Sequence, residues 1–149
     1  MSDYLIKTKV RHIGLVVRDL EKSLKFWCEI LGFSIENIME EKGQHLDLMM
    51  GLPNVNVTTA KLSDKNGSLI ELLYFKNYSD DNDLVKHPYS KGLTHIALTV
   101  DNLEKTIGKL KKLNLIDPNI PVTSPDGKVK VVYAKCHEGL LIEFVQELS

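Results

Sequence analysis

Two histidines and two glutamates occupy matched positions in the two halves of this 149-residue sequence. An offset of 83 residues superposes His12 and its neighbours on His95, and an offset of 72 residues superposes Glu71 on Glu143. Two imidazoles and two carboxylates suit a divalent first-row metal ion in near-octahedral coordination, with two positions left for water or substrate. Two adjacent open positions can hold neighbouring oxygens of one molecule, and a nearby carboxylate can then move a proton on it.

Simpler explanations exist for each residue taken alone. One histidine on one strand is usually a core residue, and a glutamate in the middle of a strand can face solvent on an antiparallel sheet. Glu71 and Glu143 lie among leucine, isoleucine, valine and phenylalanine, where a carboxylate is costly unless it is paired or binds a cation. Because both residue types recur at matched positions, the sequence favours a metal site.

The elements that must position these residues also repeat. In residues 93–101 branched apolar side chains alternate with His95 and small residues, a period of two that predicts a strand, and residues 10–17 share the pattern. Each is followed by a capping residue and a helical pattern, over 19–32 and 102–113. A turn is expected at 40–43, and the remaining strands are expected near 33–39, 45–50, 55–62, 68–75, 117–122, 128–135 and 139–146.

Each half therefore reads β-α-β-β-β. We expect an α+β fold in which two tandem βαβββ modules form a curved, barrel-like mixed sheet with the helices outside. The concave face would hold the histidines and glutamates. We interpret residues 1–149 as a single domain, with module one at 9–76, a polar linker or lid at 77–92, and module two at 93–147.

Composition excludes several classes of function. The net charge of −1 gives no indication of a nucleic-acid or membrane partner, and we expect neither. The N-terminus lacks the apolar core of a signal peptide, and no apolar run is long enough to span a membrane. Cys28 and Cys136 do not have zinc-site spacing, so we interpret them as reduced thiols of a cytoplasmic protein, with a catalytic cysteine as the lesser alternative.

Nearly the whole chain, residues 9–147, resembles the vicinal oxygen chelate superfamily. The resemblance is carried by residues 10–27, 31–33, 69–72, 92–101 and 139–144. It implies a glyoxalase-like fold, one divalent metal ion (Ni, Co, Zn, Mn or Fe), and the ligand set His12, Glu71, His95 and Glu143. A departure is Cys136-His137-Glu138-Gly139, where the family usually has an Asp-Pro-Asp-Gly turn.

The His-Glu-His-Glu set resembles the glyoxalase I branch, whereas the epimerase branch usually has glutamine at the position of Glu71. The resemblance implies a metal-dependent lyase or isomerase, similar to lactoylglutathione lyase, that acts on a small molecule chelated through adjacent oxygens. Glu143 would act as the base, with Glu71 as second choice, and a homodimer is expected. The alternatives are a methylmalonyl-CoA epimerase-like racemase and a non-catalytic protein that binds a drug or metabolite.

A few other residues are weaker candidates for the site. Gln44 and His45 begin an expected concave strand and could face substrate, although a surface turn is the simpler interpretation. Met49 and Met50 could line a pocket, with core packing as the default. Tyr133 on the penultimate strand is also a candidate pocket residue.

Overall fold

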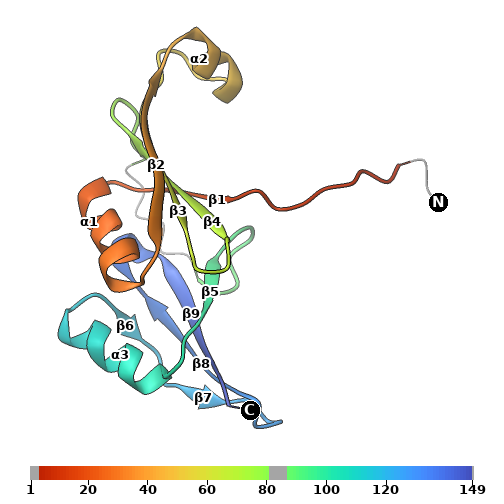
Figure 1. The fold of residues 1–149 in the computed structure, drawn as a ribbon, viewed down its shortest axis with the longest axis vertical. Helices are drawn as coiled ribbons and strands as arrows, with labels where there is room; N and C mark the ends of the chain where they lie inside the picture. Colours follow the sequence, from red (N-terminus) through yellow and green to blue (C-terminus); the bar gives the residue numbers. More distant parts are fainter. Residues whose placement is uncertain (1–3, 81–86, 149) are drawn as a thin grey trace. The chain divides into compact units, whose positions relative to one another are not determined.

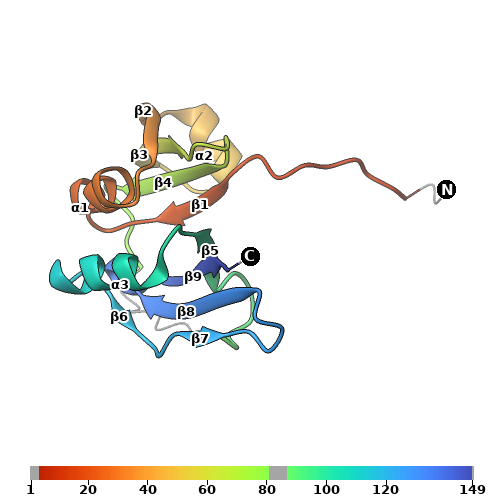
Figure 2. The same cartoon turned by 60° about the horizontal axis from the view of Figure 1, so that its bottom comes forward.

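The computed structural model describes residues 4–80 and 87–148. The chain divides into two compact units, Met1–Asp80 and Asp81–Ser149, and each contains its own sheet (Figures 1 and 2). The α+β class and the β-α-β-β-β order of each half are confirmed, with one short helix added in the first half and one short strand and a 3₁₀ turn added in the second. The predicted linker at 77–92 falls partly outside the described residues.

The first unit is a four-stranded mixed sheet with a helix after its first strand. The sheet order is β1-β4-β3-β2, in which β1 is parallel to β4 and the other pairs are antiparallel. Its elements in chain order are β1 (Ile13–Val16), α1 (Leu20–Leu24), the π-helical η1 (Lys25–Ile30), β2 (Ser34–Lys42), α2 (Gln44–Met50), β3 (Asn56–Ser63) and β4 (Leu69–Phe75).

Local chemistry explains where the first helix begins and ends. The Asp19 side chain accepts a hydrogen bond from the Lys22 backbone N–H at 2.9 Å, as an N-cap should. Trp27 is buried, and its ring meets Phe26 and Phe33 edge-on at 5.7 and 5.1 Å between centroids. Gly32 has a φ of 81°, which ends the helix as the sequence predicts.

The second unit repeats the plan. Its sheet order is β5-β9-β8-β6, with β5 parallel to β9 and with β7 paired to β8. Its elements are β5 (His95–Thr99), α3 (Leu103–Lys112), β6 (Asp117–Pro118), β7 (Val122–Thr123), β8 (Val129–Lys135), the 3₁₀ turn η2 (His137–Gly139) and β9 (Leu141–Glu147).

Helix α3 is fixed to its sheet at its first turn and along one face. Asn102 caps the Lys105 N–H at 2.9 Å, and the Gln146 side chain of β9 accepts from the Leu103 N–H at 2.7 Å. Leu103, Ile107 and Leu110 are buried at helical spacing. In Figure 2 the helix runs beside the β9 and β8 strands of this unit.

The strand expected near 45–50 is wrong, because Gln44–Met50 forms helix α2. The expected turn at 40–43 is also displaced, since β2 continues to Lys42. Two tertiary effects select the helix. Leu46 is buried with Val55 and Val57, and the Asp47 carboxylate accepts the N–H groups of Asn54 and Val55 at 2.9 and 2.7 Å.

The same helix changes the interpretation of Gln44 and His45. Both lie in the exposed first turn of α2 instead of on a concave strand. Neither side chain lines the cavity described below. In the described part of the chain, no helix has the length and apolar character needed to cross a membrane.

Candidate metal centre

Each unit places a histidine, at the start of its first strand or one residue before it, on the same face as a glutamate of the parallel neighbouring strand. Gly14 of β1 lies opposite Glu71 of β4, and Ala97 of β5 lies opposite Glu143 of β9. In each case the histidine precedes that small residue by two positions. Because side chains alternate between the faces of a strand, residues two apart share a face. The repeat in the sequence is therefore a repeat in strand register.

The two pairs are close enough to interact. His12 Nε2 lies 3.7 Å from Glu71 Oε1, and His95 Nε2 lies 3.2 Å from Glu143 Oε2. The side chains are partly shielded: His12 is 30% exposed and Glu71 15%, while His95 is 32% exposed and Glu143 22%. Each pair can therefore be reached by an ion or a small molecule from solvent.

The residue directly opposite each glutamate is small, Gly14 in the first unit and Ala97 in the second. A Cβ atom added at Gly14 would lie 3.3 Å from Leu73 Cδ1, which is tighter than ordinary contact. Ala97 occupies the equivalent position in the second unit and is exposed on the histidine face. A longer side chain at either position would project toward the glutamate opposite it.

The donor set and its spacing fit a divalent metal. Ligand atoms that each lie about 2.1 Å from a metal, at neighbouring coordination positions, are about 3 Å apart. The 3.2 Å pair matches that separation, and the 3.7 Å pair is slightly wider. Among residues 4–80 and 87–148, no group of three or more histidine, cysteine, aspartate or glutamate side chains forms a metal-binding cluster. The four-residue ligand set therefore stays a prediction.

Tyr133 lies beside the second pair. It is opposite Glu143 in the β8–β9 ladder, its ring centroid is 5.1 Å from that of His95, and its hydroxyl lies 3.5 Å from His95 Nε2. Burial raises the pKa of the Tyr133 phenol, and the charge of Glu143 and a hydrogen bond to it raise the pKa further. The predicted pocket residue is thus in contact with the candidate site.

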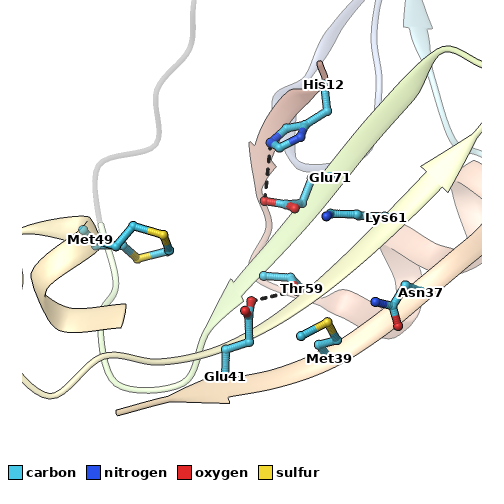
Figure 3. Close-up of a pocket in the computed structure, with 9 residues that line it drawn as sticks. His12, Asn37, Met39, Glu41, Met49, Thr59, Lys61 and Glu71 are labelled. Carbon is cyan, nitrogen blue, oxygen red and sulfur yellow. Dashed lines mark hydrogen bonds and ion pairs between the residues drawn. The ribbon is translucent and has the colours of Figure 1, made fainter. Parts of the chain in front are cut away.

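The first unit has a cavity of about 390 Å³ against its own pair (Figure 3). Thr59 Oγ1 donates to Glu41 Oε2 at 3.0 Å on its wall. Met49 is 70% exposed and lines the cavity, so core packing is the wrong interpretation for it. Met50 packs against the Leu46 cluster and lines the cavity as well. The full lining is His12, Asn37, Met39, Glu41, Met49, Met50, Thr59, Lys61 and Glu71.

Lys61 is the one positively charged lysine among the cavity residues that were not predicted from the sequence; the others are Asn37, Met39, Glu41 and Thr59. It lies opposite Glu71 in the β3–β4 ladder. The offset of 72 residues that superposes Glu71 on Glu143 also superposes Lys61 on Tyr133. Since Tyr133 was already a candidate, this equivalence is the sequence signal that could have identified Lys61, and each of the two residues is the cross-strand neighbour of its glutamate.

Comparison with known proteins agrees with this fold. The family model of the Glyoxalase/Bleomycin resistance protein/Dioxygenase superfamily matches residues 9–144. The chain belongs to that superfamily. The predicted resemblance to the vicinal oxygen chelate group is thereby confirmed.

Individual relatives of this superfamily member are distant. A probable lactoylglutathione lyase from Synechocystis sp. is 27% identical over 149 residues, which cover 98% of this chain and 97% of the relative. A mitochondrial methylmalonyl-CoA epimerase from Dictyostelium discoideum is 22% identical over 143 residues, covering 93% and 78%. A crystal structure of a glyoxalase family protein from Bacillus cereus has a TM-score of 0.88 at 20% identity, covering both chains completely.

Proposed function

We propose that this protein is a metal-dependent lyase or isomerase of the glyoxalase I type. The observation that carries the proposal is the His–Glu pair that recurs at the same strand register in both units. The histidine Nε2 lies 3.7 Å from a glutamate carboxylate oxygen in the first unit and 3.2 Å in the second. The similarity to a probable lactoylglutathione lyase over almost the entire chain supports the choice of reaction.

His12, Glu71, His95 and Glu143 would together hold one divalent ion, Ni, Co, Zn, Mn or Fe. Imidazole and carboxylate ligands suit these metals. When bound, the ion would supply Lewis-acid stabilisation of negative charge that develops on two adjacent substrate oxygens. The substrate would be a small molecule such as the thiol adduct of a 2-oxoaldehyde. The expected homodimer and cytoplasmic location belong to the same proposal.

The protein's own part in the reaction is to move one proton. Glu143 would take the proton from the carbon that bears the thioether sulfur and the hydroxyl group, while the C–H electron pair shifts toward the neighbouring carbonyl oxygen. The same carboxylate would return the proton to that neighbouring carbon. The hydroxyl proton would pass to the former carbonyl oxygen, so that the carbon bearing sulfur becomes the carbonyl, the product is an isomer and no oxidant is needed. Glu71 is the second choice for this base.

The surroundings of Glu143 support this assignment. Tyr133 adjoins both Glu143 and His95, and its hydroxyl can orient a carboxylate oxygen as the proton moves. Lys61 is the cross-strand neighbour of Glu71 instead. The neutral phenol beside Glu143 is the better neighbour for a base that must change its protonation state, because a fixed positive charge favours the ionised carboxylate.

An epimerase is the second candidate, because one relative carries that name. It would use the same ligands and remove the proton α to a thioester carbonyl. Against it stands Glu71, where that branch usually has glutamine. Incorporation of solvent deuterium at the α-carbon of methylmalonyl-CoA would support the epimerase, and retention of protium would exclude it.

The test of the leading proposal is turnover of the methylglyoxal–glutathione hemithioacetal by metal-stripped protein resupplied with Ni, Co, Mn, Zn or Fe, one at a time. We expect product with at least one metal, and about a hundredfold or greater loss of kcat in Glu143→Gln. His45→Ala, on the exposed first turn of α2, is the matched control. Absence of product with every metal would overturn the glyoxalase I assignment.

A further inference from the structure

A lone cation faces the cavity of the first unit. Lys61 lines the cavity together with His12, Glu71 and Glu41. Figure 3 shows its ammonium beside Glu71, on the same wall as Thr59, with Met49 on the opposite side. Within residues 4–80 and 87–148, Lys61 forms no ion pair, whereas Lys76 and Lys130 are paired with Glu40 and Glu104 at 2.8 Å.

The carboxylates of the cavity are engaged in other interactions. Glu41 accepts the Thr59 hydroxyl at 3.0 Å, and Glu71 is 3.7 Å from His12 and would be a metal ligand in the proposed function. Lys61 is half-buried on a sheet strand. Its ammonium has three hydrogen-bond donors, and no ion pair within residues 4–80 and 87–148 engages them, so an anionic ligand can replace the water around it.

The charge is specific to one half of the duplicated chain. Tyr133 occupies the position of Lys61 in the second module, opposite the equivalent glutamate. Packing of the strand pair therefore does not require a lysine at this position. The cavity also offers apolar contact from Met39, and from Met49 on the side opposite Lys61.

We propose that Lys61 is a specificity-determining residue that binds an anionic group of the substrate, a carboxylate or a phosphate, in the cavity of the first module. The apolar part of the substrate would lie against Met39 and Met49. This inference rests on the proposed function only for its claim that the ligand is the substrate. Selection of an anion by Lys61 can be tested without turnover.

The experiment measures binding of hexanoate, hexyl phosphate and hexanamide to the full-length, metal-stripped protein by calorimetry or by NMR titration. The three ligands share an apolar chain and differ in charge. We expect the wild type to bind hexanoate or hexyl phosphate about tenfold more tightly than the amide, since a hydrogen bond to a charged partner commonly has an effect of that size. Tighter binding of hexanoate or of hexyl phosphate identifies whether the anionic group of the substrate is a carboxylate or a phosphate.

Three variants separate a specific contact from a general effect of charge. Lys61→Met should remove the preference, and Lys61→Arg should keep most of it because the positive charge remains. Lys65→Met removes one charge from the exposed β3–β4 turn and should leave the preference unchanged. Circular dichroism would verify that each variant is folded.

Equal binding of the three ligands by the wild type, absence of binding, or a preference that survives in Lys61→Met would overturn the inference. The metal and turnover measurements are independent of this result. If the protein has no glyoxalase activity but still prefers the anions, the proposed function fails and the role of Lys61 stands. If the activity is present but the preference is absent, the role of Lys61 fails and the proposed function stands.

Discussion

His95 and Glu143 lie on neighbouring parallel strands, two residues out of direct register, with 3.2 Å between Nε2 and Oε2. His12 and Glu71 have the same relationship in the first unit at 3.7 Å. A single pair of this kind could be an ordinary surface contact. Because the pair is repeated at one register, each time with glycine or alanine opposite the glutamate, we propose that it binds a ligand.

The small residue opposite Glu143 should be needed for metal binding. In Ala97→Leu the new side chain would project over the carboxylate and occupy the space of the ion. We expect metal affinity to fall about tenfold or more, a size typical of changes around metal ligands, while folding is retained because Ala97 is exposed. Isothermal titration calorimetry measures the affinity. Thr99→Leu, on the same face and two residues farther along β5, is the control, and equal affinities in both variants would contradict the prediction.

The ionisation of Tyr133 should depend on Glu143. The pKa of the phenol is raised by burial, then by the charge of Glu143 and a hydrogen bond to it. In Glu143→Gln the charge is removed and burial remains, so the pKa should fall part of the way to its ordinary value near 10. Ultraviolet absorbance of tyrosinate reports this titration, with Tyr133→Phe identifying the contribution of this residue. A pKa unchanged by Glu143→Gln would show that the two groups are not coupled.

Cys136 should be chemically inert and should make stability depend on alkaline pH. Burial raises the pKa of its thiol to about 12 from an ordinary value of 9.0. The folded state thus favours the neutral thiol, which contributes stability below about pH 9, and this contribution is lost as the pH rises from about 9 toward 12. Denaturant unfolding at increasing pH should show a steeper loss of stability in the wild type than in Cys136→Ala. Parallel curves would refute this dependence.

Helix α2 should depend on Asp47. Its carboxylate accepts the backbone N–H groups of Asn54 and Val55 at 2.9 and 2.7 Å. Each such bond to a charged acceptor contributes on the order of 1.5–3 kcal/mol. We expect Asp47→Ala to lower the free energy of unfolding by about 2–4 kcal/mol, measured by urea denaturation, and to make the 44–55 segment more sensitive to proteolysis. Asp47→Asn should lose less, and the prediction fails if alanine has no effect.

The histidine strands and their glutamate partners could be predicted from the sequence because two signals coincide there. Period-two alternation sets the face of each strand, and the internal repeat shows that His12 and His95 are equivalent. Helix α2 could not be predicted in the same way. Its seven residues are too few to be a stable helix alone, and the contacts that select it come from Val55, just before the following strand, and from Val57 within it.

Lys61 was missed for a related reason. Whether it faces Glu71 is set by the register of the β3–β4 hairpin, which depends on how the turn around Asp64 closes. Asp64 accepts the N–H groups of Asn66 and Ser68 at 2.9 and 2.8 Å. The sequence identifies Asn66-Gly67 as a turn but leaves the register of the flanking strands open by a residue. One residue of slip would have placed Lys61 on the opposite face.

The proposed ligand set of His12, Glu71, His95 and Glu143 is tested most directly by a calorimetric metal titration of the full-length chain and of four variants. The variants are His12→Ala, Glu71→Gln, His95→Ala and Glu143→Gln, with His45→Ala as the control. We predict one ion bound per chain, and affinity at least about tenfold lower in every one of the four but not in the control. Two ions per chain, or affinity that is unchanged when either module's pair is altered, would contradict the account.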